Sequence, residues 1–352
     1  MLSPEITAVH PESTQENADL LTRIQNRVGE VSEGAVAELR ELLEREVPPP
    51  DAALLTPEAQ NYLATLDRTN REHSVAVMRL ASETYGMYAD DLQHENVSRE
   101  IFLRAAALHD IGKIGWPEGF ATANRSTAEL RTLVEQCAAI DPGFLESRLG
   151  KPAHEWTNTD WARIRKDPRE NISLAQYFSD KPALLEACQE AGYDVDNTSF
   201  MDVLRDHQPA STEAIRALDL PDRERIAALA GAHHNYEQPR VRSATTPHSE
   251  PGEMSSNLLR IIDITRALTQ DRAYHRARSE AEALVTVAEL AAKHEIEPAV
   301  ASRWVAHQLP LLRGRLANQP ADHPDRTALE TVSHMLRALP QSPENEHAAT
   351  AR

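Results

Sequence analysis

The amino-acid sequence predicts an all-α protein. Only 12 of its 352 residues are Gly and aromatic side chains make up 5%, while Ala and Leu are abundant and runs of β-branched residues are scarce. This composition favours helices over sheet. From residue 57 to about residue 310 one helix-length segment follows another, separated by short breaks rich in Pro and Gly.

The first predicted boundary lies at three consecutive prolines. Residues 13–46 carry helical periodicity, and the sequence VPPPD at 47–51 ends it because Pro cannot continue a helix. We predict an N-terminal tail with a short helical segment over 1–50, a main domain over 51–340 and a disordered tail over 341–352. The amphipathic segment 13–46 is a candidate surface for a homodimer or for a partner protein.

Charge and cysteine content exclude several classes of partner. The formal net charge of -18 argues against binding to duplex nucleic acid or to an anionic membrane, so a phosphate ligand would need local cations or a metal. Cys137 and Cys188 are the only cysteines, which is typical of a reducing compartment. Because the sequence has neither a signal peptide pattern nor a run of about 18 apolar residues, we expect a cytoplasmic protein with no membrane contact.

The first candidate ligand along the chain is His73. Leu66, Val77 and Leu80 share its side of a predicted helix, so this histidine faces the core. A core histidine held by hydrogen bonds is the alternative to a metal ligand.

A His-Asp pair follows in the stretch LHDIGKIG at residues 108–115. We predict a helix that begins at Ser98, leads along an apolar face to His109 and Asp110, and ends at Gly112. A carboxylate at a buried helix end is costly unless a cation neutralises it. The alternative is a capping aspartate beside a surface histidine.

Three further histidines follow. His233 and His234 come just after an apolar helical segment, where consecutive side chains diverge and both could reach one pocket; a surface pair is the alternative. His207 lies 26 residues before His233, ahead of a short predicted helix.

Asp263 is the most informative candidate. It lies inside a nearly all-apolar predicted helix, NLLRIIDITRALT. A buried, unpaired carboxylate costs several kcal/mol, so it needs either a metal or a salt bridge, for which Arg260 and Arg266 are close in sequence.

These residues form a set of five histidines and two carboxylates, which suits a centre of two divalent metal ions. Because the set holds no Cys, iron or manganese is more natural than structural zinc. The predicted ligands are His73, His109, Asp110, His207, His233, His234 and Asp263.

Two longer motifs carry a family resemblance over roughly residues 60–285. LHDIGKIGWPE resembles the HDIGKIGxPx motif of the HD-GYP branch of the HD superfamily of metal-dependent phosphohydrolases, and RIIDITRALTQDRAYHRA is similar to that branch's IxxIADxxDALTSDRPYRxA. The resemblance implies an HD-GYP-like helical bundle in which Asp110 bridges two metals and a metal-bound hydroxide attacks phosphorus. It also implies that Lys113 and Arg272 bind the substrate phosphate, with Lys113 assisting catalysis.

The chain departs from the family pattern at several points. HHNYEQPR replaces the loop HHExxDGxGYP, Thr69 stands where some members carry a glutamate for a third metal, and Arg266 replaces the second aspartate of DxxD. Asp167-Pro168 stands where the resemblance leads one to expect His-Pro, which makes Asp167 an alternative to His207 as the third ligand.

Three functions are compatible with these observations. The first is a metal-dependent phosphohydrolase or phosphodiesterase that hydrolyses a nucleotide or cyclic dinucleotide, as in cyclic dinucleotide signalling. The second is a catalytically silent HD-domain regulatory or interaction protein, which the altered loop would favour. The third is an HD-type di-iron oxygenase, because the same ligands can activate dioxygen.

Overall fold

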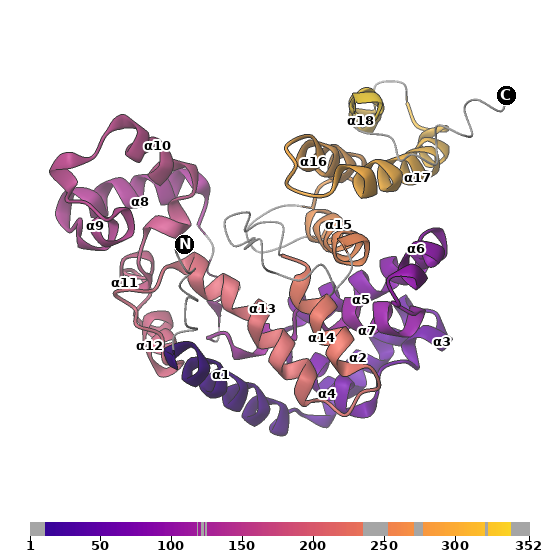
Figure 1. Cartoon of the computed structure of the whole chain (residues 1–352), viewed down its shortest axis with the longest axis horizontal. Helices are drawn as coiled ribbons and strands as arrows, with labels where there is room; N and C mark the ends of the chain where they lie inside the picture. The colour runs from indigo at the N-terminus through magenta and orange to yellow at the C-terminus, as the bar shows by residue number, and fades with distance from the viewer. Residues whose placement is uncertain are drawn as a thin grey trace, which may run out of the picture. The chain divides into compact units, whose positions relative to one another are not determined.

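The computed structural model describes residues 11–117, 119–120, 123, 125–234, 253–270, 277–320 and 323–338. The described residues form helices α1 to α18 with short 3-10 turns between them, and no strand beyond one isolated bridge between Ser173 and Ser199 (Figure 1). The predicted all-α fold is confirmed. The predicted tail at 341–352 lies outside the described residues.

The chain divides into two compact units, each built from two separate stretches of sequence. Unit 1 comprises residues 1–27 and 112–210, and unit 2 comprises residues 28–111 and 211–352. The domain boundary predicted at residues 50 and 51 stays a prediction.

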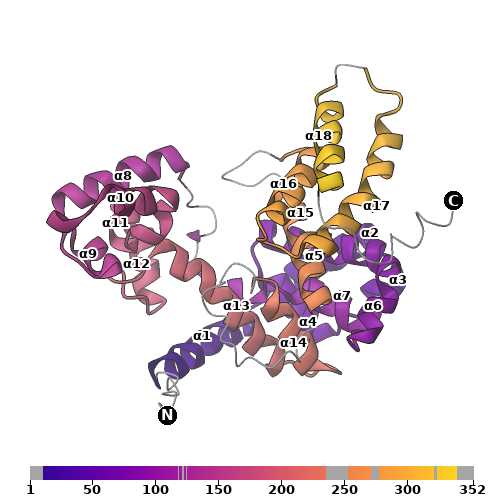
Figure 2. The same ribbon diagram turned by 45° about the horizontal axis from the view of Figure 1, so that its top comes forward.

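Unit 1 is helical around an aromatic core, and α8, α9 and α10 pack around the turn η5. Figure 2 shows α8 to α12 gathered together. The helices and turns of unit 1 are α8 (Thr127–Ile140), α9 (Gly143–Leu149), η4 (Ala153–Glu155), α10 (Asn158–Lys166), η5 (Pro168–Asn171), α11 (Leu174–Tyr177) and α12 (Pro182–Glu190). Three further elements cross the boundaries between the two units: α1 (Pro11–Gly29), η2 (Ile111–Gly115) and α13 (Phe200–Ala217).

Stacked aromatic rings form the centre of unit 1. The ring of Phe200 stacks on Tyr177 at a centroid distance of 4.3 Å and on Phe120 at 4.7 Å. All three rings are fully buried, and such aromatic stacks add to the stability that burial provides.

A close approach explains the last glycine of LHDIGKIG. A Cβ atom at Gly115 would lie 2.3 Å from Cδ1 of Leu20 on α1. Arg27, also on α1, donates hydrogen bonds to the carbonyl oxygens of Ile114 at 2.6 Å and Trp116 at 2.8 Å. Within unit 1, α1 therefore holds the backbone that follows the His-Asp pair.

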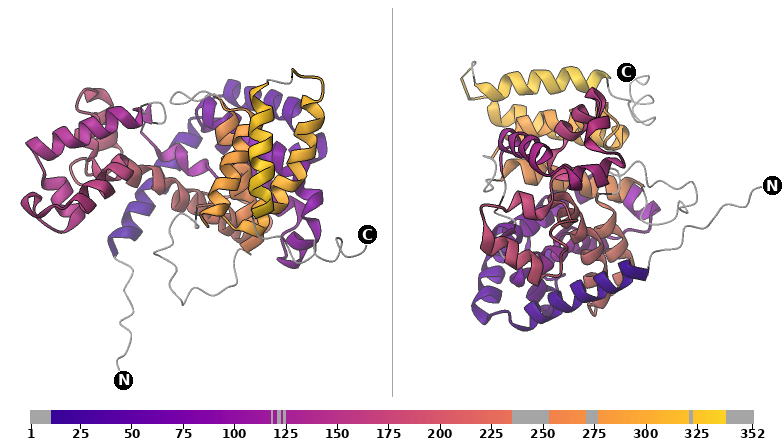
Figure 3. Two further views of the ribbon diagram at one scale, coloured as in Figure 1. Left: turned by 90° about the horizontal axis from the view of Figure 1, so that it is seen from above. Right: turned by 90° about the vertical axis from the view of Figure 1, so that its left-hand side faces the viewer.

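Unit 2 holds the remaining helices. They are α2 (Glu33–Glu46), α3 (Pro49–Ala52), α4 (Pro57–Thr65), α5 (Arg68–Thr84), η1 (Tyr85–Met87), α6 (Ala89–His94), α7 (Arg99–Leu108), α14 (Arg223–Ala232), α15 (Glu253–Thr269), α16 (Glu280–Ala292), α17 (Pro298–Leu316) and α18 (Pro324–Ala338). Helix α5 packs on α7 and α15, α14 packs on α7 and α15, and α16, α17 and α18 lie side by side (Figure 3).

Local sequence signals account for several helix ends in unit 2. Helix α2 ends at Glu46, directly before VPPPD, as predicted. The hydroxyl of Ser98 accepts a hydrogen bond from the backbone of Ile101 and caps α7, which is also confirmed. Helix α7 ends at Leu108 rather than Gly112, because the chain tightens into the 3-10 turn η2 directly after the His-Asp pair.

None of the described helices combines the length and apolarity that crossing a bilayer requires.

Candidate metal centre

Four packed helices of unit 2 bring together ligand-type side chains from distant parts of the sequence. His73 lies on α5, His109 and Asp110 follow α7, His233 follows α14, and Asp263 lies on α15. The first four are almost completely buried, and the side chain of Asp263 is 13% exposed. Burial of two carboxylates in one place requires positive charge between or beside them.

The side chains approach closely enough to share ions. Nε2 of His73 lies 2.8 Å from Oδ1 of Asp263, and Nε2 of His109 lies 3.6 Å from the same oxygen. Oδ2 of Asp110 lies 3.3 Å from Nε2 of His109 and 3.8 Å from Nε2 of His73. Ligand atoms bound to one ion at about 2.1 Å lie at most about 4.2 Å apart, so these four side chains fit a shared centre.

Two overlapping groups of three residues could each hold a metal ion. His73, His109 and Asp263 form one, and His109, Asp110 and His233 form the other; within each group the ligand atoms lie within 4.8 Å of one another. His109 belongs to both groups and therefore stands at the centre of the cluster.

The outer ring nitrogens orient the histidines. Nδ1 of His109 lies 2.9 Å from the carbonyl oxygen of Ala106, and Nδ1 of His233 contacts the carbonyl oxygen of Ala230. In both cases the acceptor lies three residues earlier, in the last turn of the helix. Because a carbonyl can only accept, Nδ1 carries a proton, and Nε2 is the nitrogen that would take a metal, as in metal-ligating histidines.

His73 is oriented by a residue that sequence reasoning missed. Its Nδ1 lies 2.9 Å from Oε1 of Gln270, which follows α15. Gln270 is seven residues after Asp263, so both lie on one face of the helical stretch. This seven-residue spacing is the sequence signal that could have identified Gln270.

The electrostatics of the cluster follow from its burial and its paired charges. Burial opposes a charge on His109, yet the charge of Asp110 and hydrogen bonds to Asp110 and Asp263 raise the pKa of His109 to about 10. Burial and the neighbouring His234 and His109 lower the pKa of His233 well below its usual range. Burial would raise the pKa of Asp263, but hydrogen bonds from His109 and His73 hold it well below its usual range.

Asp263 has two histidine partners in its buried position. Within the described residues its ion pairs are with His73 and His109 and not with Arg260 or Arg266. The predicted alternative of a salt bridge to a neighbouring arginine is therefore wrong, because the carboxylate points into the histidine cluster.

The remaining predicted ligands are His234 and His207. The ring centroid of His234 lies 4.0 Å from that of His233. His207 lies on α13 in unit 1, where its ring packs against Trp116 and its Nδ1 contacts the carbonyl oxygen of Leu204. His207 thus repeats the local arrangement of His109 and His233, with a carbonyl three residues earlier as the acceptor.

The alternative third ligand and one of the two predicted phosphate contacts belong to unit 1. Asp167 precedes η5 in unit 1, accepts a hydrogen bond from the backbone of Arg169, and has a pKa raised by burial. Lys113 also belongs to unit 1, with Nζ 5.3 Å from the ring centroid of Trp116. Arg272 lies outside the described residues.

Part of the chain matches a known protein family. Residues 70–138 match the family model described as HD domain, a segment that contains His73, His109 and Asp110. No curated protein and no solved structure matches the chain. The match, together with the buried groups of histidine and aspartate, supports membership of the HD superfamily.

Proposed function

We propose that this protein is a metal-dependent phosphohydrolase or phosphodiesterase that acts on a nucleotide or cyclic dinucleotide at a two-metal centre. The observation that carries the proposal is the orientation of three buried histidines. His73, His109 and His233 each direct Nδ1 to an oxygen acceptor and Nε2 toward other ligand-type side chains. A cluster built only for packing would not need this common ring orientation.

The ligand set assigns roles to residues of this chain. His73 and Asp263 would hold one ion, His233 and His234 the other, and Asp110 would bridge the two beside His109. His207, in preference to Asp167, would complete the set, because its ring is oriented in the same way as His109 and His233. Imidazole and carboxylate ligands without thiolate favour iron or manganese. Two such ions supply Lewis acidity and charge neutralisation for phosphoester hydrolysis.

The remaining roles concern the substrate phosphate. We propose that Lys113 and Arg272 bind the phosphoryl oxygens and stabilise negative charge as it develops on them. The Lys113 ammonium rests on the face of Trp116, and this contact would limit the positions that the flexible lysine side chain adopts.

Metal analysis combined with turnover tests this function. The purified protein is reconstituted with Mn or Fe, its bound metal is measured, and it is incubated with bis(p-nitrophenyl) phosphate and a panel of cyclic dinucleotides. Asp110→Ala is expected to remove both metal and activity, whereas Lys113→Ala keeps the metal and loses rate. Asp90→Ala, at an exposed position on α6, is the matched control.

The outcomes separate the three candidate functions. Less than one metal per chain after reconstitution would contradict the enzyme. A metal-loaded protein that is inert toward every phosphate ester would favour the silent regulator, and one that also consumes dioxygen with an organic substrate would favour the oxygenase.

The partner surface proposed at residues 13–46 covers α1 and α2. Its test is the oligomeric state of the full chain, measured by light scattering against a chain that lacks residues 1–32.

A further inference from the structure

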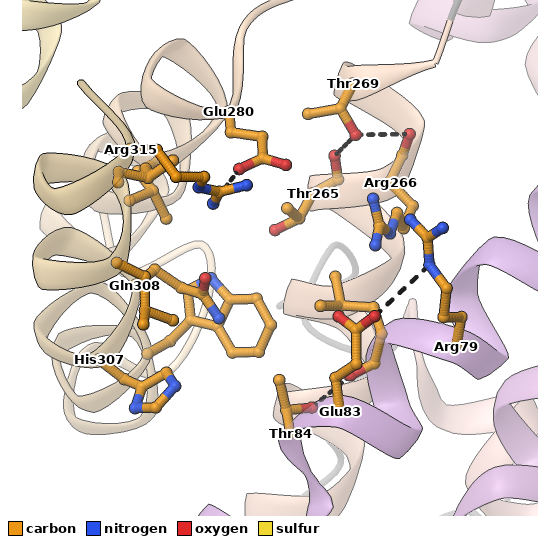
Figure 4. A pocket seen from close by; sticks show the side chains of 15 residues that line it. Arg79, Glu83, Thr84, Thr265, Arg266, Thr269, Glu280, His307, Gln308 and Arg315 are labelled. Carbon is orange, nitrogen blue, oxygen red and sulfur yellow. Dashed lines mark hydrogen bonds and ion pairs between the residues drawn. The ribbon is translucent and has the colours of Figure 1, made fainter. Parts of the chain in front are cut away.

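The charges around a cavity of unit 2 are matched by its own walls. This cavity, of about 520 Å³, is lined by α5, α15, α16 and α17 (Figure 4). Arg79 lies 3.6 Å from Glu83, and Arg315 pairs with Glu280 at 2.5 Å. Burial lowers the pKa of Arg266, and the charges of Glu83 and Glu280 oppose that effect. The described charges of this cavity therefore need no ligand to balance them.

In unit 1, by contrast, a guanidinium is committed to the backbone. Nη1 of Arg27, on α1, donates to the carbonyl oxygens of Ile114 at 2.6 Å and Trp116 at 2.8 Å. These two carbonyls flank Gly115, whose missing side chain lets Leu20 of α1 approach. Arg27 forms no ion pair with any residue that the structure describes. Its guanidinium therefore serves these two hydrogen bonds.

The bonds from Arg27 hold the end of a turn that needs outside support. The 3-10 turn η2 comprises Ile111–Gly115 and carries Lys113. Hydrogen-bond geometry in a 3-10 turn is poor, and the last carbonyls of a helical segment have no partner inside it. Arg27 supplies that partner for Ile114, the residue directly after Lys113. Helix α1 therefore fixes the backbone from which the Lys113 side chain extends.

Trp116 fixes the other end of the Lys113 side chain. Nζ of Lys113 lies 5.3 Å from the centroid of the Trp116 ring, within the range of a cation–π contact. The indole Nε1 donates to the carbonyl oxygen of Val203 on α13 at 3.1 Å, and Trp116 is only 7% exposed. Trp116 is thus held by α13 through its ring and by Arg27 through its carbonyl oxygen. Because a lysine side chain has a flexible four-carbon stem, this ring decides where the ammonium lies.

We propose that Arg27 is a positioning residue for the phosphate contact of Lys113, because it holds both the turn and the Trp116 ring that place the Lys113 ammonium. This role rests on the proposed function, in which Lys113 binds the phosphoryl oxygens. Arg27 acts through Lys113 and not on the substrate. Misplacement of a catalytic group by about 1 Å can cost about a hundredfold in rate. Helix α1 thereby contributes to turnover through one side chain.

A double-mutant cycle tests this role with bis(p-nitrophenyl) phosphate and the full-length protein loaded with Mn. Arg27→Met is expected to lower kcat about tenfold or more and to leave the bound metal unchanged. In a Lys113→Ala background the same substitution is expected to cost no further rate, because Arg27 acts only through Lys113. Arg337→Met, at an exposed position on α18, is the matched control and is expected to keep the rate of each background.

Two further readouts do not depend on turnover. The backbone N–H of Trp116 donates to the carbonyl oxygen of Lys113 at 3.1 Å. Its hydrogen exchange, followed in a peptide that spans residues 111–117, is expected to be about tenfold faster in Arg27→Met than in Arg337→Met, because the turn opens locally. The affinity for inorganic phosphate, measured by isothermal titration calorimetry, should fall about tenfold in Arg27→Met and in Lys113→Ala, with no further loss in the double variant.

The outcomes separate this role from the proposed function. Wild-type turnover with equal kcat in Arg27→Met and Arg337→Met would overturn the role of Arg27 alone. Losses from Arg27→Met and Lys113→Ala that multiply in the double variant would do the same. A wild-type protein that neither hydrolyses bis(p-nitrophenyl) phosphate nor binds inorganic phosphate would overturn both. If phosphate binds without turnover, the cycle of phosphate affinities decides by the same comparison.

Discussion

Replacing Gln270 by Leu tests whether the histidine cluster is built for metal. Gln270 contributes no ligand in our proposal and acts only through its Oε1, 2.9 Å from Nδ1 of His73. Leu has a similar size but accepts no hydrogen bond, so the variant leaves Nδ1–H of a 1% exposed histidine without its acceptor.

The expected effect is a loss of metal affinity. Removing a partner that orients a ligating histidine costs about tenfold to a hundredfold in metal affinity, equivalent to about 1.4–2.7 kcal/mol. Without this bond the proton of the His73 ring can move from Nδ1 to Nε2, which lies 2.8 Å from Asp263. A protonated Nε2 cannot bind a metal ion. Gln270→Glu keeps an acceptor and is expected to retain wild-type affinity or exceed it.

The assay is competition for Mn²⁺ against a chromophoric chelator, with circular dichroism to verify folding. Gln189→Leu, at an exposed position on α12, is the matched control. If Gln270→Leu and Gln189→Leu bind metal with equal affinity, the orientation argument is refuted and the contact is only a packing interaction.

Three further predictions concern stability. The hydrogen bond from Arg99, aided by Ser82, lowers the pKa of Asp51 against the effect of burial. The stabilisation that ionised Asp51 gives to the folded state is therefore fully present above its unfolded-state pKa, and it is lost as the pH falls through its folded-state pKa. Urea unfolding against pH should therefore show a shallower acid limb for Asp51→Asn, and an unchanged limb would contradict this. Gly115→Ala should destabilise the protein by about 1–3 kcal/mol through its contact with Leu20, whereas Gly34→Ala, with no close neighbour, should not; equal melting temperatures would be the contrary result. Chelation of bound metal should lower the melting temperature and re-addition should restore it, and a melting temperature indifferent to metal would count against the centre.

Much of the fold could be predicted from the sequence, and so could several of the residues that meet in the histidine and aspartate cluster. Composition and helical spacing predicted the all-α class, three prolines marked the end of α2, and Ser98 marked the start of α7. Asp263 was identified because a carboxylate on an apolar helix face needs a partner. These signals are local: they depend on residues within a few turns of one helix.

The tertiary structure decided which atoms meet. The contact between His73 and Gln270 joins residues 197 apart in the chain, and the salt bridge that Asp263 could have made with a neighbouring arginine gives way to two histidines from other helices. The sequence by itself determined that buried charge in these helices must be matched. Which group matches it, and which nitrogen of each histidine faces inward, depends on how helices distant in sequence pack, because periodicity specifies the buried face of a helix but not the neighbour that covers it.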